Sequence, residues 1–179
     1  MFAGQSSAAQ GEAWADVAVR AIEPRDAERC AELLSYRTGR SPTQAQKSVA
    51  GWLESPVPAR RMTLVAERGS SILGYSRADW LDPEAQGGRG PAGWYLTGLV
   101  VSADSRRHGV GTKLTEARLS RVACGSSEAW YFANERNEVS IHLHSRLGFQ
   151  HYTRDFEIPG VTFEGGAAAL FRIDLSTRI

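Results

Sequence analysis

The sequence predicts one α/β domain in which seven strands and four helices share a core. The chain has 179 residues, 42% of them hydrophobic, which is enough for a single core. Strand-like alternation and helical spacing follow each other in the order β, α, α, β, β, β, α, β, α, β, β, and no internal repeat is visible. Residues 1–15 are rich in small and polar side chains, so we expect a flexible arm there and the folded domain over 16–179.

The composition excludes several classes of partner. There are 21 basic and 20 acidic residues, so no overall charge draws the chain to nucleic acid or to an anionic membrane. No basic start followed by an apolar run and no membrane-length apolar stretch is present, which makes the cytoplasm the expected location. Cys30 and Cys124 fall on the apolar stripes of predicted helices, so we expect buried free thiols and no disulfide.

The first half of the chain predicts a strand, two helices and a hairpin. Alternation marks residues 16–22 as a strand, and the first helix runs from Pro24 until Gly39 ends it. The second helix begins at the capping-box spacing of Ser41 and Gln44 and stops before Pro56. Two strands, 62–67 and 72–80, are joined by a tight link and therefore predict an antiparallel hairpin.

The second half begins with a loop rich in Gly and Pro over residues 81–93. The continuous apolar run 94–102 predicts a central strand covered on both faces, and Gly98 marks a bulge or a close approach. The next helix is expected to bury Val110, Leu114, Ala117 and Cys124, although Arg121 interrupts this face. The remaining elements are a strand over 128–133, a helix over 137–147, and strands over 149–158 and 168–175.

The sharpest motif is the glycine turn Arg106-Arg107-His108-Gly109-Val110-Gly111, which lies between the central strand and a helix. The first amides of a helix are unpaired and the helix dipole adds positive charge, so this turn can bind an anion. It lacks the Lys-Ser/Thr pair that follows the second glycine of a nucleotide P-loop. It also lacks the third glycine of a dinucleotide fingerprint and follows the fourth strand instead of the first.

Three features together resemble the GNAT superfamily of acyl-CoA-dependent N-acyltransferases. They are the aliphatic strand at Leu99, the pattern Arg-x-x-Gly-x-Gly from Arg106 to Gly111, and the Asn137 helix that closes on Leu147-Gly148-Phe149. The resemblance spans roughly residues 17–175. It implies a mixed, mostly antiparallel sheet splayed between its fourth and fifth strands and flanked by four helices.

The same resemblance implies an acetyl-CoA site without a metal. The turn would hold the pyrophosphate through backbone amides, the strand would pair with pantetheine, and Asn137 and Ser140 would contact CoA from the next helix. Asn137 can equally serve as the helix cap. The residues implied in cofactor binding are Leu99, Val100, Val101, Arg106, Arg107, His108, Gly109, Val110, Gly111, Thr112, Asn137 and Ser140.

The catalytic pattern contains one departure. Most members of the family supply the thiolate with a proton from a tyrosine, and His144 occupies that position here. Imidazole titrates near neutral pH, so His144 either replaces the phenol as the acid or is a polar helix residue beside the cofactor. Thr97 stands where relatives often place the base, which leaves Asp79, Glu157 or a water chain for that role.

The acceptor is expected to be a small cationic amine. Acids interleaved with aromatic residues suit such a ligand through charge pairing and ring stacking, and the candidate substrate residues are Asp79, Trp80, Asp82, Trp94 and Glu157. An aminoglycoside antibiotic, for example of the kasugamycin kind, is the leading hypothesis and would make the protein a resistance enzyme. The alternatives are a protein or peptide amine and a CoA-sensing domain without turnover. The last strand pair could add to a neighbour's sheet edge and form a homodimer.

Overall fold

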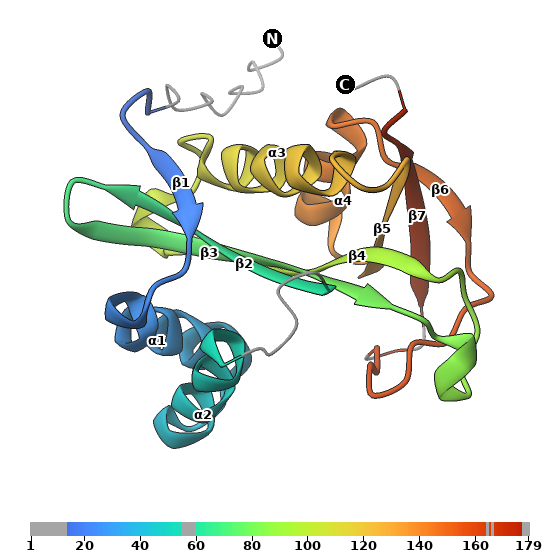
Figure 1. The fold of residues 1–179 in the computed structure, drawn as a ribbon, viewed down its shortest axis with the longest axis horizontal. Coiled ribbons are helices and arrows are strands. Elements are labelled where there is room, and N and C mark those ends of the chain that lie inside the picture. Colours follow the sequence, from blue (N-terminus) through green and yellow to red (C-terminus); the bar gives the residue numbers. More distant parts are fainter. Residues whose placement is uncertain (1–13, 55–59, 164, 166, 177–179) are drawn as a thin grey trace, which may run out of the picture.

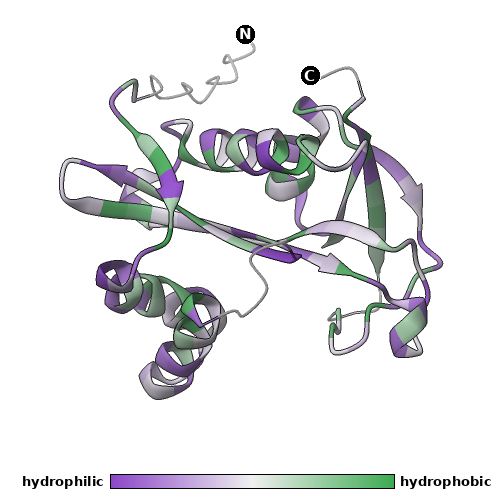
Figure 2. Cartoon of the chain, viewed as in Figure 1, coloured by the Kyte–Doolittle hydropathy of each residue, from purple (hydrophilic) through white to green (hydrophobic). Residues whose placement is uncertain are grey.

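The computed structural model describes residues 14–54, 60–163, 165 and 167–176. Most of the predicted arm, residues 1–13, therefore lies outside the described residues. The described chain forms one central sheet with helices on both faces (Figure 1). In Figure 2 both hydrophilic and hydrophobic bands run along α3, as expected for a helix that rests one face on a sheet.

The sheet has seven strands in the order β1-β2-β3-β4-β5-β7-β6. Every neighbouring pair is antiparallel except β4 and β5, which are parallel. The predicted mixed, mostly antiparallel sheet is therefore confirmed. The strands are β1 (Ala18–Ala21), β2 (Arg61–Arg68), β3 (Ser71–Leu81), β4 (Gly93–Val101), β5 (Glu128–Asn134), β6 (Gln150–Thr153) and β7 (Ala168–Asp174).

Two helices cover each face of the sheet. α1 (Ala27–Thr38) and α2 (Pro42–Leu53) lie on one face, and α3 (Val110–Ala123) and α4 (Glu138–Arg146) lie on the other (Figure 1). Alternate residues of β2 and β3 serve the two sides: Val65 and Tyr75 pack with α1 and α2, whereas Leu64 packs with α3.

Local sequence signals account for the helix ends. Gly39 ends α1 in the left-handed conformation at φ 69°, as a C-terminal glycine commonly does. Ser41 and Gln44 form the predicted capping box at the start of α2, where each side chain accepts a hydrogen bond from the other residue's amide. These ends were predictable because the residues responsible are neighbours in the chain.

Two expectations were wrong. The strand predicted over 149–158 is only four residues long, because Asp155 donates its amide to Thr153 and turns the chain out of the sheet. The buried face of α3 is also shifted. Arg121 and Cys124 are exposed, so only Cys30 is a buried thiol. The buried stripe passes instead through Arg118, which is 1% exposed.

Arg118 is a buried cation held by carbonyl groups. Its Nη1 donates to the carbonyl oxygens of Arg77 on β3 (2.9 Å) and Gly98 on β4 (3.0 Å), and its Nη2 donates to Thr115 Oγ1 (2.9 Å). No carboxylate pairs with it in the described part of the chain. Burial lowers the pKa of Arg118 to about 9, so the guanidinium is still charged at neutral pH.

Removing the charge of Arg118 has two opposing effects of similar size on the free energy of unfolding. A pKa depressed from 12.5 to about 9 corresponds to about 5 kcal/mol against the buried cation. Each acceptor left without a donor costs about 1–3 kcal/mol. We therefore expect Arg118→Met to change the free energy of unfolding by less than about 2 kcal/mol, whereas Arg118→Ala, which also leaves a cavity, loses roughly 2–5 kcal/mol more.

Urea denaturation of both variants measures these differences, with Arg121→Met on the exposed face of the same helix as the control. A loss above about 4 kcal/mol in Arg118→Met would show that the hydrogen bonds outweigh the cost of burying the charge.

Candidate active site

The glycine turn is shaped by two left-handed residues. A short 3-10 helix, Ala103–Ser105, follows β4, and Arg107 (φ 67°) and Gly109 (φ 77°) then reverse the chain. The first backbone bond of α3 joins the amide of Lys113 to the carbonyl of Gly109 at 3.0 Å. The amides of Val110, Gly111 and Thr112 come before this bond and are available to an anion at the helix N-terminus.

The segment before β1 closes one side of this turn. The Trp14 ring stacks on His108 with centroids 4.1 Å apart, and its amide donates to the His108 carbonyl. Lys113 Nζ binds the carbonyl oxygens of Trp14, Ala15 and Val17 at 2.8–3.3 Å. The Arg68 guanidinium lies 4.4 Å over the Trp14 ring. His108, predicted to add charge at the mouth of the turn, is thus packed against the N-terminal segment.

The sheet opens directly beside the turn. β4 and β5 pair only at Tyr95↔Trp130 and Leu96↔Tyr131, and from Thr97 onward β4 has no partner on its β5 side. β4 carries one extra residue against β3 between the pairs Asp79↔Tyr95 and Arg77↔Gly98. The predicted splay and the bulge near Gly98 thus both lie at this point.

Gly111 lies at the mouth of this opening. A Cβ built on Gly111 would meet Leu143 Cδ1 at 3.2 Å, Leu99 Cδ2 at 3.8 Å and Val101 Cγ2 at 3.9 Å. Three elements, α3, α4 and the free end of β4, therefore converge on the missing side chain. The glycine lets these elements pack this closely, because a side chain at this position would press on Leu143.

The α4 residues predicted for the site adjoin the opening. The Asn137 side chain accepts a hydrogen bond from the Ser140 amide and so caps α4, which is the alternative role considered for it from the sequence. Ser140 Oγ accepts a hydrogen bond from the Tyr131 hydroxyl at 2.6 Å. His144, one turn further, lies flat on the Tyr131 ring with centroids 3.7 Å apart.

The protonation state of His144 follows from its surroundings. Its side chain is 2% exposed, and Nδ1 lies 2.8 Å from the Ser140 carbonyl oxygen, so Nδ1 carries the hydrogen. Nε2 is buried and has no hydrogen-bond partner among the described residues. Burial lowers the pKa of His144 to about 4, so the ring is neutral at pH 7 and Nε2 presents a lone pair.

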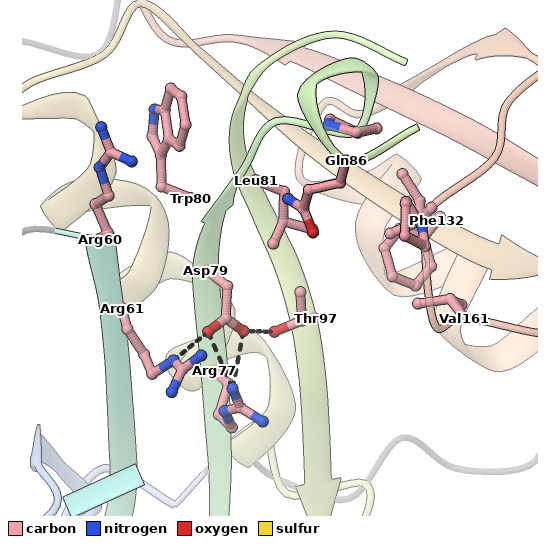
Figure 3. Close-up of a pocket in the computed structure, with 13 residues that line it drawn as sticks. Arg60, Arg61, Arg77, Asp79, Trp80, Leu81, Gln86, Thr97, Phe132 and Val161 are labelled. Carbon is pink, nitrogen blue, oxygen red and sulfur yellow. Dashed lines mark hydrogen bonds and ion pairs between the residues drawn. The ribbon is translucent and has the colours of Figure 1, made fainter. Parts of the chain in front are cut away.

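A pocket of about 570 Å³ lies on the other side of the opening, with Thr97 of β4 and Phe132 of β5 in its lining. Asp79, 6% exposed, forms its floor. It accepts hydrogen bonds from Arg61 Nε at 2.7 Å, from Arg77 Nη2 at 3.0 Å to each oxygen, and from the Thr97 hydroxyl (Figure 3).

Only two of the five predicted substrate residues, Asp79 and Trp80, line this pocket. Asp82 instead accepts the amide of Ala85 in the next turn. Trp94 packs against the core on the α3 side, and Glu157 is exposed while its backbone bridges to Arg89. The side chains of Asp82 and Glu157 lie in connections outside this lining, and Trp94 lies on β4 with its ring packed against the core.

The sequence prediction missed the basic residues of the pocket, Arg60, Arg61 and Arg77. The strand period of two contains a usable signal, because it places Arg61 and Thr63 on the same face as Arg77 and Asp79. The hairpin register Arg61↔Asp79 and Thr63↔Arg77 then brings them together. Arg118, which binds the Arg77 and Gly98 carbonyls at the bulge, was missed for a different reason. An arginine in a helix is normally expected to be exposed to solvent.

Among the described residues, no group of three or more histidine, cysteine, aspartate or glutamate side chains could hold a metal ion. No helix in this part of the chain has the length and hydropathy required to span a membrane.

Several solved structures have the same fold as this chain. The Salmonella typhimurium protein yncA, solved with its cofactor acetyl-CoA, is 17% identical with a TM-score of 0.69, covering 90% of this chain and 95% of its own. An aminoglycoside 6'-acetyltransferase type Ii is 16% identical (TM-score 0.67; 88% and 97% covered). The Escherichia coli ribosomal-protein-S18-alanine N-acetyltransferase is 17% identical (TM-score 0.65; 89% and 94% covered). At these identities the likeness shows the fold alone.

No curated protein sequence matches the chain significantly. The model of the acetyltransferase (GNAT) family, however, matches residues 25–149, which include α1, the open sheet, the glycine turn and α4. The chain therefore belongs to the acetyltransferase (GNAT) family and is an acetyl-CoA-dependent acetyltransferase.

Proposed function

We propose that the protein transfers an acetyl group from acetyl-CoA to a primary amine that enters through the pocket on the α1 and α2 side. The observation that supports this best is the opening between β4 and β5, because it joins the anion-binding turn to that pocket. Backbone amides from Arg107 to Thr112 would hold the pyrophosphate, with Arg106 and His108 beside them. The free edge Leu99–Val101 would pair with the pantetheine arm as an added strand does. Asn137 and Ser140 would border the same arm.

The residues at the opening fit such a ligand. The amides of Val110, Gly111 and Thr112 have no partner within α3, and the buried Nε2 of His144 has no hydrogen-bond partner among the described residues. When bound, acetyl-CoA supplies an acetyl thioester. The chain's own task is to orient that group at the bulge and to offer unpaired β4 amides to the charge that develops on the carbonyl oxygen.

We propose His144 as the group that moves the proton. A neutral ring with a bare Nε2 cannot begin as an acid, because with a pKa of about 4 only about one molecule in a thousand is protonated at pH 7. It can accept the proton that the attacking amine loses and pass it to the departing sulfur, so that it ends neutral again. Asp79 fits the role of base poorly, since both of its oxygens already accept hydrogen bonds.

The acceptor is proposed to be a small molecule, because a volume of about 570 Å³ lies in the range of small-ligand pockets. The aminoglycoside hypothesis depended on several acids around the ligand, and Asp79 is the one acid among the described residues that line the pocket. A peptide amine remains the alternative, and a sensing domain without turnover is the third.

Free thiol release separates these functions. The protein and acetyl-CoA are mixed in turn with amino acids, amino-acid amides, an aminoglycoside, a polyamine and peptides. Rapid release with one class identifies the acceptor. If acetyl-CoA stabilises the protein but no amine causes thiol release, the result would favour a sensing domain over an enzyme.

Gly111→Val tests the acetyl-CoA site. The added carbons would press on Leu143 and displace the N-terminus of α3 that carries the proposed pyrophosphate site, so we expect the rise in Tm caused by acetyl-CoA to fall by at least half. Gly51→Val is the matched control, because Gly51 also lies in a helix and has nothing within 4 Å of its added Cβ. An undiminished rise in folded Gly111→Val would place the cofactor elsewhere.

His144→Phe tests the proton transfer. We expect kcat at saturating substrates to fall by about 10²–10⁴-fold with a smaller change in KM, which is the usual contribution of a proton-transfer group. His142→Phe, exposed on the same helix, should keep its kcat. Unchanged kcat and an unchanged pH profile in His144→Phe would remove His144 from the catalytic machinery.

The pKa of His144 also predicts how stability depends on pH. The unfolded chain takes up a proton near pH 6.5, but the folded protein does so only near pH 4, so the free energy of unfolding falls as pH drops through this interval. The full contribution of His144 is about 3 kcal/mol, present above pH 6.5 and lost by pH 4. Urea titrations at pH 7 and pH 4.5 should show a smaller loss in His144→Phe than in His142→Phe. Equal losses in the two variants would contradict the buried neutral ring.

A further inference from the structure

The charge of the acceptor pocket is positive. Arg60, Arg61 and Arg77 line it, and Asp79 is the one acidic residue among its described lining residues. Three arginines and one aspartate leave a net charge of +2. A ligand with several positive charges would be repelled here, whereas a ligand with a negative group would be attracted.

Asp79 has no free capacity for a substrate ammonium group. A carboxylate offers about four lone-pair sites. Arg61 and Arg77 donate three hydrogen bonds to the Asp79 carboxylate, and the Thr97 hydroxyl donates a fourth. A cationic amine could bind Asp79 only by displacing one of these donors.

The arginines, by contrast, retain donors. Arg61 uses only Nε on Asp79, and Arg77 uses only Nη2 on it. Arg60 lies 4.5 Å over the Trp80 ring, which holds its guanidinium at the pocket wall, and it forms no ion pair with the residues described. A planar guanidinium with unused N–H groups matches a carboxylate in geometry and in charge.

The opposite wall is apolar. Phe132 and Val161 face Arg61 and Arg77 across the pocket, whereas Trp80 lies beside Arg60 and Gln86 adds one polar side chain to the lining (Figure 3). This wall suits a hydrocarbon or aromatic body of limited size.

We propose that the acceptor is a primary amine that also carries a carboxylate and an apolar group, of the amino-acid or short-peptide class. Arg60, Arg61 and Arg77 bind the carboxylate, and the Phe132 side holds the apolar body. This inference rests on the proposed function and adds the class of its substrate. The positive charge also disfavours the ammonium form of the bound amine and so leaves it neutral for attack.

Matched acceptors test the inference. Thiol release is measured with L-phenylalanine and L-phenylalaninamide, with L-leucine and L-leucinamide, and with an aminoglycoside. The amide keeps the amine and side chain but lacks the carboxylate, and its less basic amine is chemically the easier one to acetylate. We expect kcat/KM to be at least tenfold higher for the acid of the preferred pair, which is about what one charged hydrogen bond contributes.

Arg60→Gln is the informative variant, because Arg60 forms no bond to Asp79 and its loss leaves that network intact. We expect the preference for the acid to fall about tenfold through a higher KM, while kcat/KM for the amide stays the same. Arg121→Gln removes the same charge from an exposed position on α3 and should keep the preference.

A binding measurement avoids dependence on turnover. With CoA present, N-acetyl-L-phenylalanine should raise Tm more than N-acetyl-L-phenylalaninamide, and Arg60→Gln should abolish the difference. Faster turnover of an amide or of an aminoglycoside would overturn the inference and leave the proposed function standing. Binding of acetyl-CoA without turnover of any amine would overturn both.

Discussion

The site depends on the position of Arg118 under the bulge. Its guanidinium rises from α3 and binds the carbonyl oxygens of Arg77 and Gly98, on the two strands that meet where the sheet begins to open. Buried ion pairs and charges add little to stability once desolvation is counted, so an arginine at this place is better explained by the geometry it fixes. Two carbonyls tied to one planar group cannot slide past each other. The bulge, and with it the direction of the free end of β4, is thereby set.

The opening divides the chemistry between the two faces of the sheet. On the α3 and α4 side lie the helix amides at Gly111, which have no partner within α3, and the unpartnered Nε2 of His144. On the α1 and α2 side lie Arg61, Arg77 and Asp79. Alternation along each strand separates these sets, since Tyr131 stacks on His144 while its neighbour Phe132 lines the pocket. A donor and an acceptor could therefore meet only at the bulge, where neither strand blocks the passage.

Features set by neighbouring residues were predictable from the sequence, and features set by distant partners were not. Gly39, the Ser41–Gln44 cap and the turn at Gly109 act within one helical turn, so the sequence alone locates them. The burial of Arg118 depends on carbonyls 20 and 41 residues away. The network at Asp79 depends on a register that joins Arg61 to a residue 18 positions later. Residue type drew attention to His144, but its tautomer follows from the Ser140 carbonyl and its neutrality from burial under Tyr131.

The charges on the two faces support the same reaction. An amine can attack a thioester only when it is neutral, and an aspartate whose lone pairs are occupied is a poor group to deprotonate it. Three arginines around the acceptor favour the neutral amine before any base acts. In the proposed mechanism, a buried histidine with a low pKa would hold the proton only briefly and pass it to the more basic sulfur. In the proposed reaction, the positive pocket that would select a carboxylate also lowers the demand on a base, which fits Thr97 standing on β4 at the position where relatives often place a carboxylate.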